Sequence, residues 1–152
     1  MKVLIATDGS EAAIEAARRA LPLLAPPDTV LVVCVVEPPS IAAEGFESGF
    51  AGGVAAPEEI DAAWGAANQE ALEALARTVA VLDTGATVEQ LVENGDIGPT
   101  LCAVADEQAC DVVVASSRGH GAIRRALLGS VSTHLVNHAP CPVMVVREGA
   151  GT

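Results

Sequence analysis

Aromatic side chains are nearly absent from this chain: they make up 2% of its 152 residues, and tyrosine does not occur. Hydrophobic residues nevertheless account for 51%, so valine, leucine, isoleucine and alanine must fill the core. Such a composition is typical of buried parallel strands covered by alanine-rich helices. The length suits one domain of ordinary size, and we expect residues 1–152 to form it.

Positive charge is also scarce. The chain has 8 Lys and Arg against 20 Asp and Glu, which gives a formal net charge of -12. Nucleic acids and membrane surfaces are anionic, so this balance disfavours broad binding to either. Lys2 is the only lysine. The P-loop pattern GxxxxGK[ST], which needs a lysine beside the phosphates, is absent.

Long hydrophobic runs are missing as well. None approaches the roughly 20 residues needed to cross a bilayer. The first apolar stretch turns polar at Thr7 and Asp8, too early for the core of a signal peptide. We therefore expect a cytoplasmic protein. Its cysteines form no CxxC pair, and reduced, mostly buried thiols are expected at Cys34, Cys102, Cys110 and Cys141.

Short apolar runs alternate with segments of helical periodicity. The predicted strands are Val3–Ala6, Thr29–Val36, Ala86–Glu93 (weaker and nearer an edge), Val112–Ala115 and Val143–Val146. The predicted helices are Glu11–Leu24, Pro57 to about Leu82, Ile97–Gln108 and Val131–His138. Strict alternation implies an α/β fold with parallel strands, right-handed crossovers and helices on both faces. The Gly-, Ala- and Ser-rich stretch Ser40–Ala56 is interpreted as a mobile loop.

The segment from Val112 to Arg147 differs from the rest of the chain. It contains no Asp or Glu and holds four of the eight Lys and Arg residues. Its loop carries Gly119, Gly121, Arg118, Arg124 and Arg125, and Gly129-Ser130 stands directly before the last predicted helix. Glycine lets backbone N–H groups approach a phosphate closely. A helix start adds N–H groups and the positive end of a dipole, so the segment predicts a phosphate-binding loop.

Ligands of open parallel sheets bind beyond the carboxyl ends of the strands, where the strand order reverses. If the first and fourth predicted strands are neighbours, two loops meet at that point. One is Thr7–Ser10 and the other is Ser116–Ser130. We therefore expect the binding site between these two loops.

The spacing of Gly119, nine residues and then Gly129-Ser130 resembles the signature of the universal stress protein family. The segments ATDGS, SRGHG, LLGSVS and HAPCPVMVVR carry the same likeness, which covers essentially the whole chain. The resemblance implies an open, Rossmann-like, five-stranded parallel sheet in the order 3-2-1-4-5. It also implies a homodimer through the last strand, Val143–Val146. Some members of the family bind ATP, usually with a divalent cation such as Mg²⁺ or Mn²⁺, and others do not.

The family's ATP-binding pattern is a glycine, two residues, a second glycine, nine residues, then glycine and Ser or Thr. Ser116 stands at the first glycine position, and the rest matches at Gly119, Gly129 and Ser130. By resemblance, Asp8 and Val35 flank the adenine and ribose, and Ala115 to Gly119 lie along the nucleoside and phosphates. The implied nucleotide site comprises Ala6, Thr7, Asp8, Val35, Ala115, Ser116, Arg118, Gly119, Gly129, Ser130, Val131 and Ser132. No side chain is implied as a metal ligand.

Several of these residues have a plainer interpretation. Asp8 could cap the first helix, with Glu11 completing a capping box. Val35 could be core alone, and Ser130 could be only a helix cap. Ser116 would cost about 1 kcal/mol if a positive φ were required there. Its hydroxyl could instead meet the ribose.

The remaining candidates are basic or imidazole side chains. Arg124 and Arg125 are adjacent, so a helix would point them about 100° apart and at most one would face a phosphate. His120 could be a ligand or a loop-surface residue. His134 and His138 are four residues apart and could share a helix face, but the sequence offers no third ligand for a metal site.

Three functions remain open on the sequence. The leading hypothesis is a nucleotide-binding regulatory protein of the stress response that acts as a nucleotide-dependent switch on an unknown protein partner. The alternative is a dimeric interaction protein without nucleotide. A slow nucleotide hydrolase is suggested only by analogy of fold. No serine shows an evident His and carboxylate arrangement, so the chain is not predicted to be an enzyme.

Overall fold

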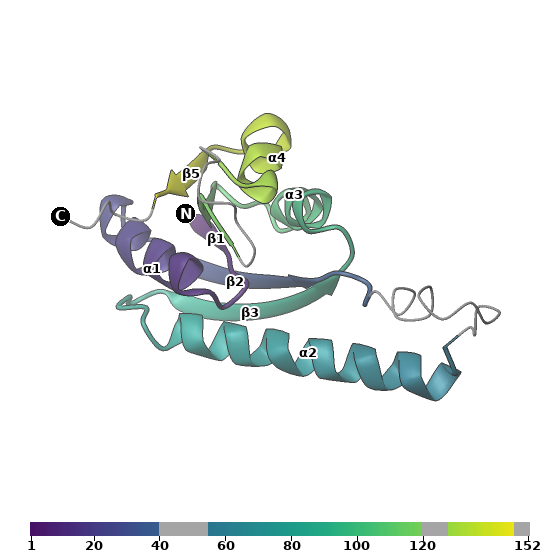
Figure 1. Cartoon of the computed structure of the whole chain (residues 1–152). Coiled ribbons are helices and arrows are strands. Elements are labelled where there is room, and N and C mark those ends of the chain that lie inside the picture. The colour runs from purple at the N-terminus through teal and green to yellow at the C-terminus, as the bar shows by residue number, and fades with distance from the viewer. Residues whose placement is uncertain (40–54, 120–127, 148–152) are drawn as a thin grey trace.

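The computed structural model describes residues 1–39, 55–119 and 128–147 (Figure 1). Five strands and four α-helices alternate along these residues. The strands are β1 (Lys2–Ala6), β2 (Thr29–Val36), β3 (Thr87–Asn94), β4 (Val112–Ser116) and β5 (Val143–Val146). The helices are α1 (Glu11–Ala20), α2 (Pro57–Val79), α3 (Ile97–Glu107) and α4 (Ser130–His138).

All strand pairs are parallel, and the strand order is β3-β2-β1-β4-β5. The predicted α/β fold, the strand order implied by the resemblance and the edge position of β3 are all confirmed. After β3 the chain crosses back over β2 and β1 to form β4, so the winding direction reverses between β1 and β4. Right-handed crossovers then place α1 and α2 on one face of the sheet and α3 and α4 on the other.

Each face of the sheet has its own core. Along β1, Val3 and Ile5 pack toward α1 and α2, whereas Leu4 packs toward α3 and α4. All three are fully buried, as expected for a central strand covered on both sides. Helices therefore cover both faces of the sheet, and the loops that follow the strands lie along its carboxyl edge.

Two helices end about one turn earlier than predicted, and α3 ends one residue early, at Glu107. The first helix was expected to reach Leu24, but α1 ends at Ala20 and a 3₁₀ turn, Leu21–Leu23, follows. Pro22 explains this end, because its ring nitrogen cannot donate the next helical hydrogen bond. The second helix was expected to reach about Leu82, but α2 ends at Val79. After Val79 the backbone hydrogen bonds join residues three apart instead of four, and Leu82 N–H donates to Val79 O at 3.1 Å.

The loop predicted at Ser40–Ala56 lies almost entirely outside the described residues, which resume at Ala55. Within the described ranges, no helix combines the length and the apolar character needed to cross a membrane.

Candidate functional site

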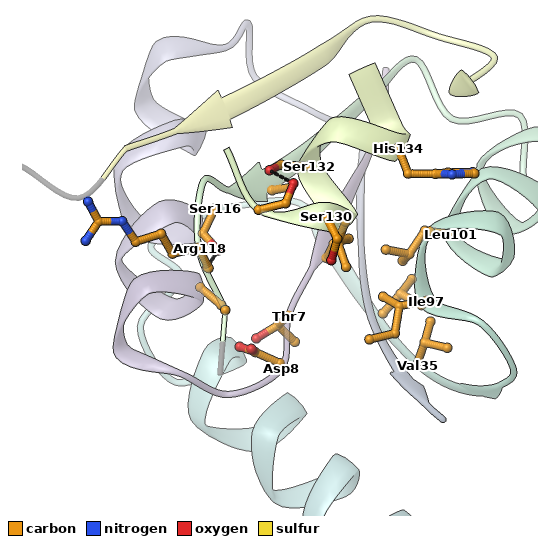
Figure 2. Close-up of a pocket in the computed structure, with 18 of the residues that line it drawn as sticks. Thr7, Asp8, Val35, Ile97, Leu101, Ser116, Arg118, Ser130, Ser132 and His134 are labelled. Carbon is orange, nitrogen blue, oxygen red and sulfur yellow. Dashed lines mark hydrogen bonds between the residues drawn. The ribbon is translucent and has the colours of Figure 1, made fainter. Parts of the chain in front are cut away.

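A cleft of about 650 Å³ opens at the carboxyl ends of β1 and β4, where the strand order reverses. Its walls come from the ends of β1, β2 and β4 and from the starts of α3 and α4 (Figure 2). The two loops expected to meet at this point do meet. An alanine Cβ built at Gly119 would lie 2.7 Å from Asp8 Oδ2, so the Asp8 carboxylate directly faces the loop after β4.

The loop between β1 and α1 is held by its own side chains. Gly9 N–H donates to Thr7 Oγ1 at 3.0 Å, and Ser10 N–H donates to Asp8 Oδ1 at 2.9 Å. Ser10 caps α1, since its Oγ accepts the Ala13 N–H at 3.2 Å. The alternative that Asp8 caps this helix with a capping box is therefore wrong. Asp8 is instead turned toward the cleft.

Ser116 occupies the last position of β4, where the resemblance predicted a glycine. Its φ is not positive, because Ala109 is the only residue other than glycine with a positive φ in the described ranges. The strain considered for Ser116 therefore does not arise. Its hydroxyl donates to the carbonyl oxygen of Arg118, which fixes the turn that leads to Gly119.

The start of α4 forms one wall of the cleft. Gly129 is the N-cap residue, and no side chain of the described residues caps the helix. The alternative that Ser130 is the cap is therefore wrong, because Ser130 is already the first helical residue. Gly129 N–H donates to Ser117 O at 2.8 Å, and the first helical bond runs from Thr133 N–H to Gly129 O at 3.0 Å. The three intervening amides, at residues 130–132, precede that bond and stand at the positive end of the helix dipole.

The charged side chains around the cleft are mostly acidic. Asp8, Glu37 and Asp96 line it, and Arg118 is the basic residue among the described lining residues. In Figure 2 the Arg118 guanidinium points away from the other labelled residues. The predicted contributions of His120, Arg124 and Arg125 fall outside the described part of the chain. Within that part, backbone amides at the start of α4 are the main groups suited to an anion.

An apolar wall lies opposite the polar loops. Val35, Ile97 and Leu101 gather there in Figure 2, and Leu101 is 1% exposed. Ile97 and Leu101 were not among the predicted site residues, and His134 was considered only as a possible metal ligand. The strand order could have indicated the contribution of α3, because the connection from β3 to β4 must carry this helix across the face of β2 and β1. One end of the cleft thus suits a flat apolar group and the other an anion.

His134 joins α3 to α4 at the edge of the cleft. An alanine Cβ at Gly98 would lie 2.7 Å from His134 Cγ, so glycine is needed for the ring to pack there. The rings of His134 and His138 stack with centroids 4.3 Å apart, which confirms that they share a helix face. No group of three or more His, Cys, Asp or Glu in the described ranges is arranged to hold a metal ion.

The cysteines are unpaired thiols, as expected. Cys34 and Cys110 are buried, and Cys102 and Cys141 are partly buried. Burial, with a smaller contribution from the nearby Asp8 carboxylate, raises the pKa of the Cys34 thiol to about 11. A thiol that stays protonated at neutral pH is a poor nucleophile and a poor metal ligand, so Cys34 is part of the core.

The cleft brings together the residues of the predicted nucleotide site. Ala6, Thr7, Asp8, Val35, Ala115, Ser116, Arg118, Gly119, Gly129, Ser130, Val131 and Ser132 all line it. Their contact with a ligand stays a prediction. The hydroxyls of Thr7 and Ser116 already bond within the protein.

Comparison with known proteins identifies relatives of the whole chain. The model of the universal stress protein family matches residues 1–147. Universal stress protein MJ0531 of Methanocaldococcus jannaschii is 26% identical over 148 residues, which are 97% of this chain and 82% of that protein. Shorter matches to plant and mycobacterial universal stress proteins span only 39% and 24% of the length of those relatives.

Solved structures share the fold. The hypothetical protein MJ0577 superposes with a TM-score of 0.71 at 22% identity, over 99% of this chain and 97% of that one. An Arabidopsis thaliana family protein with AMP bound gives 0.63 at 21% identity, over 99% and 93%. A universal stress protein in complex with cAMP gives 0.58 at 24% identity, over 96% of each chain. Because the family model matches almost the full length, this chain belongs to the universal stress protein family.

Proposed function

We propose that the cleft binds an adenine nucleotide. The observation that carries this proposal is the start of α4, whose amides at residues 130–132 line the cleft without a side-chain cap among the described residues. A phosphate there would accept hydrogen bonds from these amides and lie at the positive end of the helix dipole. AMP and cAMP in the two structural neighbours support the same class of ligand.

The apolar wall suits the base. Val35 and Ile97, backed by the buried Leu101, form a surface against which a purine could pack. Asp8, in the loop after β1, could accept hydrogen bonds from ribose hydroxyls. The cleft volume of about 650 Å³ lies within the range usual for small-molecule sites. ATP with Mg²⁺ or Mn²⁺ is the form that we propose first. A cation would offset repulsion between the triphosphate and the carboxylates of Asp8, Glu37 and Asp96.

The proposed role is regulatory binding in a stress response. Binding of the nucleotide would change the surface that a protein partner reads, and the protein would act as a switch in the cytoplasm.

Equilibrium dialysis with labelled ATP, AMP and cAMP, each with and without Mg²⁺, tests the proposal. We expect saturable uptake by the wild-type protein. Gly129→Glu should abolish it, because even a Cβ at this position would lie 3.2 Å from Ser117 O and the added carboxylate would repel phosphate. Gly65→Glu is the matched control, since nothing lies within 4 Å of a Cβ there. No saturable uptake up to about millimolar nucleotide, a limit of about 4 kcal/mol, would refute the proposal.

A homodimeric interaction protein is the second candidate, and β5 is the observation that favours it. This strand is an edge of the sheet, and its four residues, Val143–Val146, are apolar and only partly buried. An apolar edge strand can pair with a second copy. Pairing through β5 would leave the cleft open, because the cleft lies at the carboxyl ends of β1 and β4 and not on the free edge of β5. The two candidates therefore differ in whether the cleft binds a nucleotide.

A further inference from the structure

Thr78 is a fully buried polar residue on a helix that contributes nothing to the lining of the cleft. It lies in the last turn of α2, on a buried face otherwise made of Ala71, Ala74 and Leu75, and its exposed fraction is 0%. Threonine is a weaker helix former than alanine or leucine, so local propensity does not explain its presence. Its hydroxyl must also find partners, because an unbonded buried hydroxyl is costly.

One of these partners is ordinary. Thr78 Oγ1 donates to Ala74 O, one turn earlier, at 2.8 Å. Threonines within helices often bond in this way, and the bond alone would indicate only that the side chain is tolerated.

The second partner connects α2 to the cleft. Thr7 Oγ1 lies 2.8 Å from Thr78 Oγ1, and both side chains are buried. A hydroxyl has one proton, and that of Thr78 is given to Ala74 O. Thr7 must therefore donate to Thr78. A lone pair of Thr7 Oγ1 in turn accepts the Gly9 N–H at 3.0 Å.

The packing at Gly9 shows how closely the loop rests on α2. Gly9 has a φ of 74°, and a Cβ there would lie 2.6 Å from Ala74 Cβ and 2.5 Å from Arg77 Nη2. The loop backbone is thus pressed against the same turns of α2 that carry Thr78. Asp8 lies between the two loop residues, Thr7 and Gly9, that this hydrogen-bond chain fixes.

We propose that Thr78 is a positioning residue for the nucleotide site, acting through Thr7 and Gly9 to hold the Asp8 carboxylate toward the cleft. This inference rests on the proposed function, since it assigns a remote residue to that same site. Buried hydroxyl chains whose every member is satisfied specify one backbone arrangement. Loss of the Thr78 hydroxyl leaves the Thr7 proton without its acceptor, and the loop can then leave its binding conformation.

Two variants at this position separate positioning from general stability. Thr78→Val keeps the shape and removes the hydroxyl, whereas Thr78→Ser keeps the hydroxyl and removes a methyl group. Both changes destabilise the fold, the first through an unsatisfied partner and the second through a small cavity. Their thermal midpoints measure that shared effect.

The binding measurement is titration calorimetry with AMP at a temperature where both variants are folded. We expect Thr78→Val to raise the dissociation constant about tenfold, because the loop loses about one stabilising hydrogen bond. The dissociation constant of Thr78→Ser should stay within about twofold of the wild-type value. Amide exchange at Gly9 should become faster in Thr78→Val and remain slow in Thr78→Ser.

Two results would overturn the inference in distinguishable ways. Equal AMP affinity in wild type and Thr78→Val, or equal weakening in both variants, would show that Thr78 has only a structural role while nucleotide binding stands. No AMP or other nucleotide binding by the wild-type protein would remove the proposed function and this inference with it.

Discussion

At the scale of the residue, Ala109 has a left-handed backbone conformation that is strained for a residue other than glycine. Its φ is 48°, and it follows α3. Cys110 N–H donates to Ala105 O at 2.9 Å and Ala109 N–H to Asp106 O at 3.0 Å, the two bonds of a Schellman motif. Glycine usually occupies this left-handed position, because it costs other residues about 1–2 kcal/mol.

We predict that Ala109→Gly raises the free energy of unfolding by about 1 kcal/mol, measured by urea denaturation. Ala103→Gly, at an exposed position inside α3, is the control and should lower it by a similar amount. Destabilisation by both substitutions would mean that the positive φ of Ala109 carries no cost.

Gly119 tests the opposite case, in which a small side chain harms binding but not folding. Its Cβ would lie 2.7 Å from Asp8 Oδ2, so the Asp8 carboxylate must turn from its position in the cleft, while no backbone atom is that close to the added Cβ. We predict that Gly119→Ala weakens nucleotide binding several-fold while the free energy of unfolding changes by no more than about 0.5 kcal/mol. Fluorescence titration with a labelled nucleotide measures the first quantity and urea denaturation the second.

Gly85→Ala serves as the control for this replacement, since nothing lies within 4 Å of a Cβ at that loop position. Unchanged affinity in both variants would show that the orientation of Asp8 does not matter to the ligand.

At the scale of the element, a negative charge added at the start of α4 should stabilise the helix and weaken nucleotide binding. Ser130→Asp adds a negative charge to the first turn, which stabilises a helix by about 0.3–1 kcal/mol. The same charge would face the bound phosphate, and two like charges a few ångströms apart repel strongly near a protein surface. We predict a thermal midpoint that is unchanged or higher, with nucleotide affinity lowered at least about tenfold.

Thr133→Asp is the matched control for Ser130→Asp. Thr133 is exposed, lies one turn further along the same helix and does not line the cleft. It should retain affinity within about threefold, since solvent screens a charge at that exposed site. Equal loss in both variants would point to a general effect of net charge and not to a phosphate at the helix start.

The elements themselves were largely predictable. Short apolar runs that alternate with segments of helical periodicity predict the five strands and four helices, and the predicted bounds of β2 match the structure. Strand bounds differ by one residue at most, and the larger errors lie at helix ends. At the helix starts, neighbouring residues compete for the N-cap position. Asp8 and Ser10 both have an oxygen suited to capping α1, and only the backbone conformation at Ser10 decides between them. At α4 the N-cap position falls on Gly129, although the neighbouring Ser130 is the residue with a hydroxyl suited to capping.

The site was predictable to the extent that its groups lie next to strand ends in the sequence. Asp8 and Gly119 each follow a strand, and strand order brings them together. The apolar wall of Ile97 and Leu101 comes from α3, whose path over the sheet depends on long-range topology. Thr78 could not have been found from the sequence, because its partner, Thr7, lies 71 positions away.

At the scale of the whole molecule, the free edge of β5 leads to a prediction about assembly. If this strand pairs with a second copy, Val145→Lys should give monomers in sedimentation velocity, because it would place a charge within an apolar interface. Leu72→Lys on α2, at a side chain that is 53% exposed, is the control and should leave the sedimentation coefficient unchanged. A Val145→Lys variant that stays dimeric would refute pairing through β5.

The central claim is that backbone amides at the start of α4 bind the phosphate of an adenine nucleotide. Backbone NMR of the labelled protein, titrated with AMP, tests it most directly. We predict saturable shifts of the Ser130, Val131 and Ser132 amide signals with one common dissociation constant, and smaller shifts when adenosine replaces AMP. Shifts that leave these three amides unmoved while other parts of the protein respond, or no saturable shift at all, would contradict the claim.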